Sequence, residues 1–260
     1  MRQPAEAGSW AAEHNRAPMS DRPSSLALRR FALFDDLPPA RLDALAGRCA
    51  WRRVAAGQPL LLRRQRRADV YLVIDGAVRV TTYGANGRQV TFRDLGAGEI
   101  VGDLAALDGQ PRSADVMTVE DSLVAVLDRE AFLELLQDEP TVARRQMQRL
   151  TTLVRQLSER VIELSTLGVQ NRLHAELLRL ARSADPEAAA GEVRLAPAPR
   201  HAELASRIST NREQVTRELN ALVRSGLLRK EGDALVVTEV ARLARVVADV
   251  MGDVMGDGGA

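Results

Sequence analysis

A narrow apolar stripe runs along a predicted long helix at residues 140–168. Its members recur in alternating steps of four and three residues, so they share one face of an α-helix. The stripe also divides the chain, because short strand-like runs precede it and helix-like patterns follow it. We therefore predict two folded domains joined by this helix. The members of the stripe are Ala143, Met147, Leu150, Val154, Leu157, Val161 and Leu164.

Such a stripe packs either against the helix's own domain or against the same helix of a second copy. A stripe of two positions per heptad, sustained for about three heptads, favours self-association. We therefore expect a homodimer. Its expected interface consists of Met147, Leu150, Val154, Leu157, Val161 and Leu164.

The composition describes a soluble globular chain and excludes several classes of site. Of the 260 residues, 45% are hydrophobic and 27% are charged, and no apolar run approaches the length of a bilayer span. The first residues lack the apolar core of a secretory signal, so we expect a cytoplasmic protein. The single cysteine, Cys49, excludes an intrachain disulfide and any iron–sulfur cluster or structural zinc site held by cysteines. The net charge of +1 decides nothing about a nucleic-acid partner.

Short runs rich in Val, Leu, Ile and Thr alternate with glycine-centred turns between residues 51 and 127. Evenly spaced short strands of this kind predict an antiparallel barrel or jelly roll. The pair Asn86-Gly87 predicts a hairpin, because both residue types tolerate a positive φ. The predicted strands are Leu60–Arg63, Val70–Ile74, Val78–Tyr83, Val90–Leu95, Ser113–Val119 and Ser122–Leu127.

The stretch Gly98–Ala114 combines closely spaced glycines with an arginine. Glycines let the backbone approach a ligand with its N–H groups free, and the planar donors of Arg112 suit a phosphate. The stretch therefore predicts a phosphate-binding loop. The alternative for Arg112 is a surface ion pair with Asp108 or Asp115.

This stretch resembles the phosphate-binding cassette of cyclic-nucleotide-binding domains, whose core reads G-E-L-A followed by P-R-[AST]-A. The chain carries Gly102-Asp103-Leu104-Ala105 and Pro111-Arg112-Ser113-Ala114, so an aspartate replaces the family's glutamate. The resemblance implies that Arg112 pairs with the cyclic phosphate and Ser113 donates a hydrogen bond to it. The residues implied to contact the ribose and phosphate are Gly102, Asp103, Leu104, Arg112 and Ser113.

The segment His201–Arg224 predicts two helices joined by a tight turn. Apolar residues give each helix one inward face, and Ser209, Thr210 and Asn211 supply turn and N-cap chemistry before the second helix. Polar side chains at the start of that helix suit base edges in the major groove. The strand-like segment that follows predicts a wing, with Arg229 and Lys230 placed for phosphates. The candidate DNA-binding residues are Asn211, Arg212, Glu213, Gln214, Thr216 and Arg217.

The order of these parts resembles the bacterial Crp/Fnr family of transcription regulators. The family's recognition helix carries an R-E-x-x-x-R pattern, met here by Arg212, Glu213 and Arg217. The resemblance implies an α+β fold, with an N-terminal cyclic-nucleotide-binding antiparallel β-roll (jelly roll), a long dimerisation helix and a C-terminal winged helix-turn-helix. It also implies a homodimer on a palindromic operator in double-stranded DNA, with RNA polymerase as a partner. No catalytic constellation or metal-ligand spacing is visible, so we expect no enzyme activity.

We divide the chain into five segments. Residues 1–24 are expected to be a disordered tail, 25–139 the cyclic-nucleotide-binding-like domain and 140–168 the dimerisation helix. Residues 169–245 are expected to form the DNA-binding domain and 246–260 a flexible tail. Met1 and Met19 are both candidate start residues, because the fold-like pattern begins only after Met19.

The resemblance makes cAMP the first candidate effector, with two departures. Asp103 is one methylene shorter than the glutamate that accepts from the ribose 2′-hydroxyl. The family's dimer helix offers adjacent hydroxyls to adenine, and here those positions hold Leu157 and Ser158, so only Ser158 keeps its hydroxyl. Cyclic GMP, cyclic di-GMP and activity without a ligand stay open. A haem sensor has no histidine ligand in the predicted roll, because the histidines are His14, His174 and His201.

Overall fold

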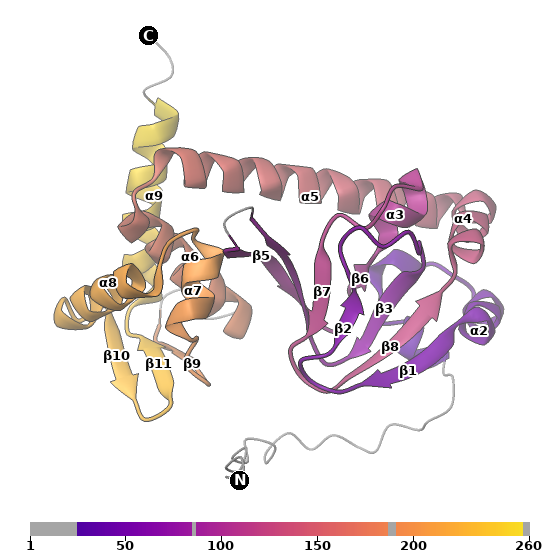
Figure 1. The fold of residues 1–260 in the computed structure, drawn as a ribbon, viewed down its shortest axis with the longest axis horizontal. Coiled ribbons are helices and arrows are strands. Elements are labelled where there is room, and N and C mark those ends of the chain that lie inside the picture. Colours follow the sequence, from indigo (N-terminus) through magenta and orange to yellow (C-terminus); the bar gives the residue numbers. More distant parts are fainter. Residues whose placement is uncertain (1–24, 85–86, 187–190, 257–260) are drawn as a thin grey trace.

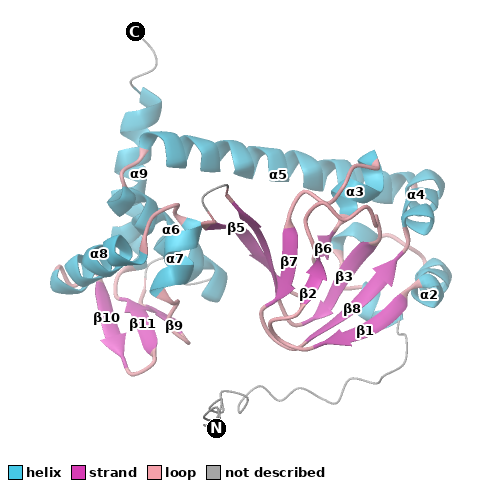
Figure 2. Cartoon of the chain, viewed as in Figure 1, coloured by secondary structure: helices cyan, strands magenta, loops and turns pink. Residues whose placement is uncertain are grey.

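The structure is a computed structural model, and it describes residues 25–84, 87–186 and 191–256. A two-sheet β domain stands at one end and a helical domain at the other, with one long helix spanning both (Figure 1; Figure 2). The expected tail at 1–24 and Asn86 of the expected turn lie outside the described residues. Within the described residues, no helix is both long and apolar enough to cross a membrane.

Two four-stranded antiparallel sheets form the β domain, which confirms the predicted roll. One sheet has the order β1-β8-β3-β6 and the other β2-β7-β4-β5. The strands β1 and β6 were missing from the sequence prediction. The strands are β1 (Ala50–Val54), β2 (Pro59–Leu61), β3 (Val70–Asp75), β4 (Val78–Tyr83), β5 (Gln89–Leu95), β6 (Ile100–Val101), β7 (Asp115–Thr118) and β8 (Ser122–Leu127).

Five consecutive residues of strand β3, 70–74, are buried. Because side chains alternate across a strand, both faces of β3 are therefore covered. Tyr71 and Val73 face the core between the two sheets. Val70, Leu72 and Ile74 face a second core on the outer side of the same sheet. Short helices cover that outer side, namely α1 (Ser25–Leu28), η1 (Ala32–Phe34), α2 (Pro39–Arg48) and α4 (Arg129–Asp138).

The long helix α5 (Pro140–Thr166) lies along the β-roll and turns the predicted stripe outward. Val142 and Gln146 are buried against the roll. On the other face, Met147, Val154 and Val161 are each 61% exposed. In this chain the stripe therefore does not pack on its own domain.

The helical domain has a core of its own beyond α5. It holds the predicted pair of helices and a three-stranded sheet of order β10-β11-β9. Residues 246–256, expected to be part of a flexible tail, instead continue helix α9, because Val240, Leu243 and Val247 recur at helical spacing and pack into this core. The elements are α6 (Val169–Ala184), β9 (Val193–Leu195), α7 (His201–Arg207), α8 (Arg212–Arg224), β10 (Leu228–Glu231), β11 (Ala234–Val237) and α9 (Val240–Gly256).

A cluster of ion pairs joins the β-roll to the helical domain. On the roll, the Nε atom of Arg79 donates to Asp94 over 2.7 Å. Across the domain boundary, Arg207 of α7 binds Asp94, and Arg79 binds Glu203. The hydroxyl oxygens of Thr91 and Ser206 lie 2.9 Å apart beside this cluster. The β4–β5 hairpin is thus fixed to α7 through residues away from its turn.

The same cluster reaches α5 and α6. Glu163 of α5 accepts from Arg160 at 2.6 Å and from Arg179 of α6 at 2.7 Å. Arg207 bonds to Glu176 of α6 at 3.2 Å. We call the interdomain cluster the set Arg79, Asp94, Arg160, Glu163, Glu176, Arg179, Glu203 and Arg207.

The interdomain cluster makes the docking of the two domains depend on pH. Burial alone would raise the pKa of Asp94 and of Glu163, but hydrogen bonds from Arg79 and Arg179 lower both pKa values below their ordinary range. A carboxylate whose pKa is lowered on folding stabilises the contact above its unfolded pKa and loses this as pH falls through the folded pKa. We therefore expect hydrogen-exchange protection of α7 to be full at pH 7 and to decline below about pH 4.

Two variants test the assignment. Asp94→Asn should lower the hydrogen-exchange protection of α7 already at pH 7, and that protection should then depend less on pH. Glu134→Gln removes a carboxylate that pairs with Arg48 inside the β-roll domain and should leave the profile of α7 unchanged. Equal profiles for Asp94→Asn and the parent protein would contradict this role of the cluster.

Candidate functional site

A partly open pocket lies between the β-roll and α5. Helix α3 (Asp103–Asp108) begins at its wall, and Leu153 of α5 closes one side. The pocket brings together the predicted residues Gly102, Asp103, Leu104, Arg112 and Ser113.

Gly102 permits the closest packing in this pocket. Its φ of 87° is left-handed, a conformation that side chains other than glycine's disfavour. A Cβ at this position would meet the Nη1 atom of Arg112 at 2.6 Å and the backbone oxygen of Asp69 at 2.7 Å. Glycine is therefore required here for Arg112 to reach its place.

The guanidinium of Arg112 is buried and fixed by backbone oxygens. Its Nη1 atom donates to Gly102 at 2.8 Å and its Nη2 atom to Asp69 at 2.7 Å. The predicted alternative, an ion pair with Asp108 or Asp115, does not form. Burial lowers the pKa of Arg112, and its Nε–H has no hydrogen-bond partner among the described residues. A buried donor without a partner is costly, so this geometry suits an anion in the pocket.

Asp103 is buried and already bound to α5. Its Oδ2 atom accepts from the Nη1 atom of Arg149 at 2.5 Å and from the Nε2 atom of Gln146 at 2.8 Å. Arg149 also donates to the backbone oxygen of Ile100 at 2.8 Å. The expected ribose partner thus also connects the wall of the pocket to the long helix.

The other predicted ligand residues do not all line the pocket. Leu104 is 41% exposed at the mouth, and Ser113 is exposed beside Arg112. Ser158 does not line the pocket. Its hydroxyl donates to the backbone oxygen of Val154 on the exposed face of α5. Leu153, five residues earlier on α5, lines the pocket instead.

Sequence reasoning missed four residues of this site: Arg93, Gln146, Arg149 and Leu153. Arg93 belongs to β5, and the other three belong to α5 outside the heptad stripe. The spacing of Gln146, Arg149 and Leu153 by three and four residues marks a second face of α5. That spacing was the only sequence signal for their shared role.

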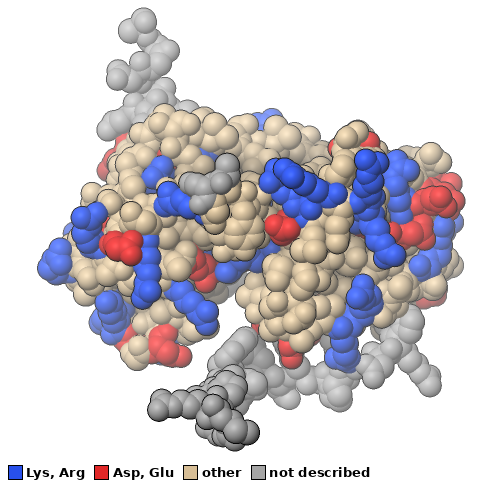
Figure 3. Space-filling view, in the orientation of Figure 1, with Lys and Arg blue, Asp and Glu red and all other residues tan. Residues whose placement is uncertain are grey.

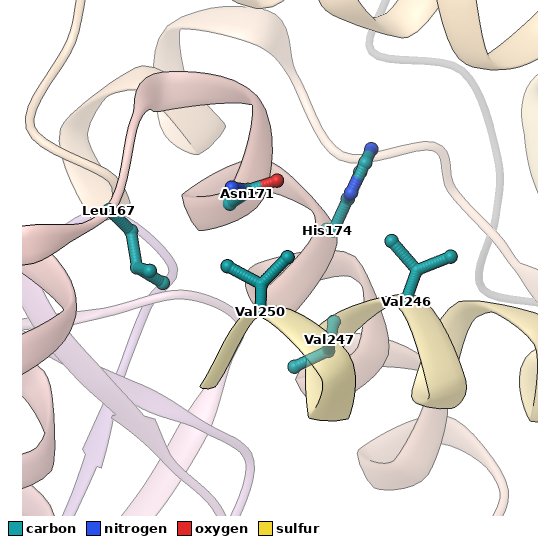
Figure 4. A pocket seen from close by; sticks show the side chains of 6 residues that line it. All are labelled: Leu167, Asn171, His174, Val246, Val247 and Val250. Carbon is teal, nitrogen blue, oxygen red and sulfur yellow. The ribbon is translucent and has the colours of Figure 1, made fainter. Parts of the chain in front are cut away.

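A second pocket lies where α5, α6 and α9 meet, and Figure 4 shows its lining. His174 is buried there, and burial lowers the pKa of its imidazole. Both ring nitrogens lack hydrogen-bond partners within the described part of the chain. The surroundings are mostly apolar, with Val246, Val247 and Val250 on α9. The two pockets share no lining residue.

Helix α8 presents the predicted DNA-reading residues at its amino-terminal end. The Oδ1 atom of Asn211 accepts from the backbone N–H of Gln214 at 2.8 Å, which confirms the predicted N-cap. Arg212, Glu213 and Arg217 are exposed. The inward residues Val215, Leu219 and Leu222 are buried, as are Leu204, Ala205 and Ile208 of the helix pair.

Three polar residues of this region are engaged within the chain. Thr216 is half-buried, and its hydroxyl donates to the backbone oxygen of Arg212. In the wing formed by β10 and β11, Arg229 binds Glu192 and Glu231. These two carboxylates would compete with a DNA phosphate for Arg229. Lys230 donates to the side-chain amide oxygen of Asn220 at 3.3 Å. Lys and Arg side chains lie over α8 and the wing at the left of Figure 3.

Comparisons with known proteins match both halves of this arrangement. The family described as "Cyclic nucleotide-binding domain" matches residues 51–139, and the "Crp-like helix-turn-helix domain" matches residues 171–246. The Cyclic AMP receptor protein of Thermus thermophilus is 32% identical over 219 residues, which cover 82% of this chain and 95% of the relative. The chain belongs to the Crp/Fnr family.

Other Crp/Fnr proteins show the same arrangement at lower identity. A CRP-like cAMP-activated global transcriptional regulator of Mycobacterium tuberculosis is 23% identical, over 84% of this chain and 97% of the relative. The solved structure of a c-di-GMP-responsive global regulator from Xanthomonas campestris has a TM-score of 0.67 at 22% identity. It covers 77% of this chain and 99% of that one. This Crp/Fnr protein is therefore a transcription regulator with a cyclic-nucleotide-binding domain and a DNA-binding helix-turn-helix.

Gly102→Ala tests the construction of the pocket. We expect the variant to lose stability by more than the roughly 1–2 kcal/mol that a left-handed φ costs, because its Cβ displaces Arg112. Nucleotide affinity should fall with it. The matched control is Gly57→Ala, at a φ of +75° with open space around the added Cβ. Denaturant unfolding and titration with cAMP measure both effects, and equal losses in the two variants would contradict the role of Gly102.

Proposed function

We propose that this Crp/Fnr protein is a homodimeric transcription regulator whose DNA affinity is controlled by a cyclic nucleotide bound between the β-roll and α5. The proposal of a nucleotide site rests on one observation. Arg112 is buried, aimed by two backbone oxygens, and keeps an unpaired N–H at a pocket. A cyclic phosphate supplies the missing acceptor and the opposite charge.

The names of the curated relatives support cAMP as the first candidate effector. Asp103 has one carboxylate oxygen committed to α5, so a sugar hydroxyl has the other oxygen as its acceptor. Cyclic GMP and cyclic di-GMP remain the alternatives at the same site, as does a regulator that is active without ligand.

The exposed stripe of α5 supports the homodimer. Four of its members stand largely in solvent in the single chain, which leaves an apolar surface uncovered. Pairing of two such helices would cover this surface and place one α8 on each side of a two-fold axis. Two recognition helices related in this way suit a palindromic site with half-sites about one helical turn apart. The proposed interface is Met147, Leu150, Val154, Leu157, Val161 and Leu164.

The route from the pocket to DNA runs through α5. Asp103 holds α5 at the pocket, and Glu163 joins the far end of α5 to α6. The interdomain cluster then holds α7, which precedes the recognition helix α8. A nucleotide that shifts α5 would therefore change the position of α8.

The remaining parts of the proposal concern setting and partners. A regulator of this kind acts on chromosomal DNA in the cytoplasm and works with RNA polymerase. No catalytic role is assigned to any residue. The described residues contain no group of three or more His, Cys, Asp or Glu side chains suited to a metal ion.

Arg217→Ala tests the recognition helix. Arg217 is exposed on α8, and its Nη2 atom donates to the side chain of Gln214 at 2.7 Å. A bidentate arginine–guanine contact contributes about 1–3 kcal/mol of discrimination, so the variant should lose sequence-specific binding and keep weak, salt-sensitive affinity. Arg182→Ala, at an exposed arginine of α6, is the matched control. Fluorescence anisotropy on selected and scrambled duplexes measures this, and wild-type selectivity in Arg217→Ala would contradict the assignment.

A further inference from the structure

A second arginine, Arg93, lines the pocket beside Arg112. This residue belongs to β5 and is half-buried. It forms no hydrogen bond or ion pair with any residue that the structure describes. Glu99 attracts it through space without bonding to it, and Asp103 is occupied by Arg149. Arg93 is thus a partly desolvated cation without a bonded counter-ion.

Three guanidinium groups lie at or beside the pocket. Arg149 is paired with the buried carboxylate of Asp103, whereas Arg93 and Arg112 form no ion pair with a described residue. The carboxylates of Glu99 and Asp69 act on these two arginines only through space. Burial and the charge of Arg149 lower the pKa of Arg93, the direction expected of a cation that lacks compensation. Arg112 accounts for one phosphate, and a ligand with a single charge leaves Arg93 uncompensated.

The loop beside the pocket adds further positive charge. This loop, which we call the arginine loop, joins β2 to β3 and is bonded to the cassette backbone. The N–H of Arg64 donates to the oxygen of Arg112, and the N–H of Arg112 donates to the oxygen of Gln65, each at 2.9 Å. Figure 3 shows Lys and Arg side chains gathered on the β-roll near α3. The exposed arginines of the loop are Arg63, Arg64, Arg66 and Arg67.

We propose that Arg93 forms a second anion subsite, so that the pocket prefers a nucleotide with two phosphate groups, as in a cyclic dinucleotide. Arg112 binds the first phosphate inside the pocket, and Arg93 binds the second on the β5 side. The arginine loop raises the local concentration of such an anion by its field. The inference rests on the proposed function, because it assumes that a nucleotide binds at Arg112.

The test is calorimetric titration of the full chain with cAMP, cyclic di-GMP and cyclic di-AMP. Wild-type protein should bind at least one cyclic dinucleotide about tenfold or more tightly than cAMP, with a steeper dependence on salt. Arg93→Gln should remove about tenfold of that dinucleotide affinity, the scale of a hydrogen bond to a charged group, and change cAMP affinity by less than about twofold. Arg93→Lys should retain part of the dinucleotide affinity.

The matched control is Arg52→Gln, at an exposed arginine of β1 in the opposite sheet, which should bind both ligand types as the parent does. Thermal unfolding confirms that each variant is folded. Tight cAMP binding with no preference for a dinucleotide, or equal loss of both ligands in Arg93→Gln, would overturn the second subsite and leave the proposed function intact. Binding of none of the three nucleotides would overturn both.

Discussion

The carboxylate of Asp103 joins the wall of the pocket to the long helix α5. It lies at the first position of α3, beside the glycine that lets Arg112 reach the pocket. A charge buried at this depth needs a partner, and Arg149 and Gln146 of α5 supply it. The wall of the pocket and the long helix are therefore held by the same side chain. A ligand that moves Asp103 would therefore also move its partners on α5.

The far end of α5 carries that connection to the DNA-binding half. Glu163 binds arginines of α5 and α6, and Arg207 of α7 binds carboxylates of both the β-roll and α6. Such a network has several partners for each charge, so it transmits position better than an isolated surface pair. The β-roll, α5, α6 and α7 are thus linked to one another by ion pairs, and we propose that these contacts connect the pocket to α8.

Local sequence patterns predicted the helices and strands whose formation depends on periodicity or on a short motif. The predicted strands Val78–Tyr83 and Ser122–Leu127 match β4 and β8, and the predicted helix at 140–168 matches α5 within two residues. Strand β6 is only two residues long and exists through its pairing with β3, which no local pattern reveals. Helix α9 was missed because a Gly- and Asp-rich end obscured the apolar spacing before it.

The residues of the candidate site also fall into two groups: those that a local motif predicts and those that only tertiary contacts bring to the pocket. The cassette motif identifies Gly102 and Arg112, because their roles depend on the local backbone. The contact between Asp103 and Arg149 spans 46 residues and depends on how α5 crosses the roll. Arg93 reaches the pocket from yet another element, the outer strand β5 of its sheet. These tertiary contacts determine the charge of the pocket and its connection to α5, so they required the structure.

Operator affinity with and without nucleotide tests the coupling most directly. The duplex would be a palindrome selected by the protein from random sequence, and the ligands cAMP and cyclic di-GMP at saturation. We expect an effective ligand to change the affinity of wild-type protein by about fivefold or more, the usual scale of coupling between two sites. Arg149→Gln should still bind the ligand, with that change largely lost. The same ligand response in Arg149→Gln as in wild type would contradict the account.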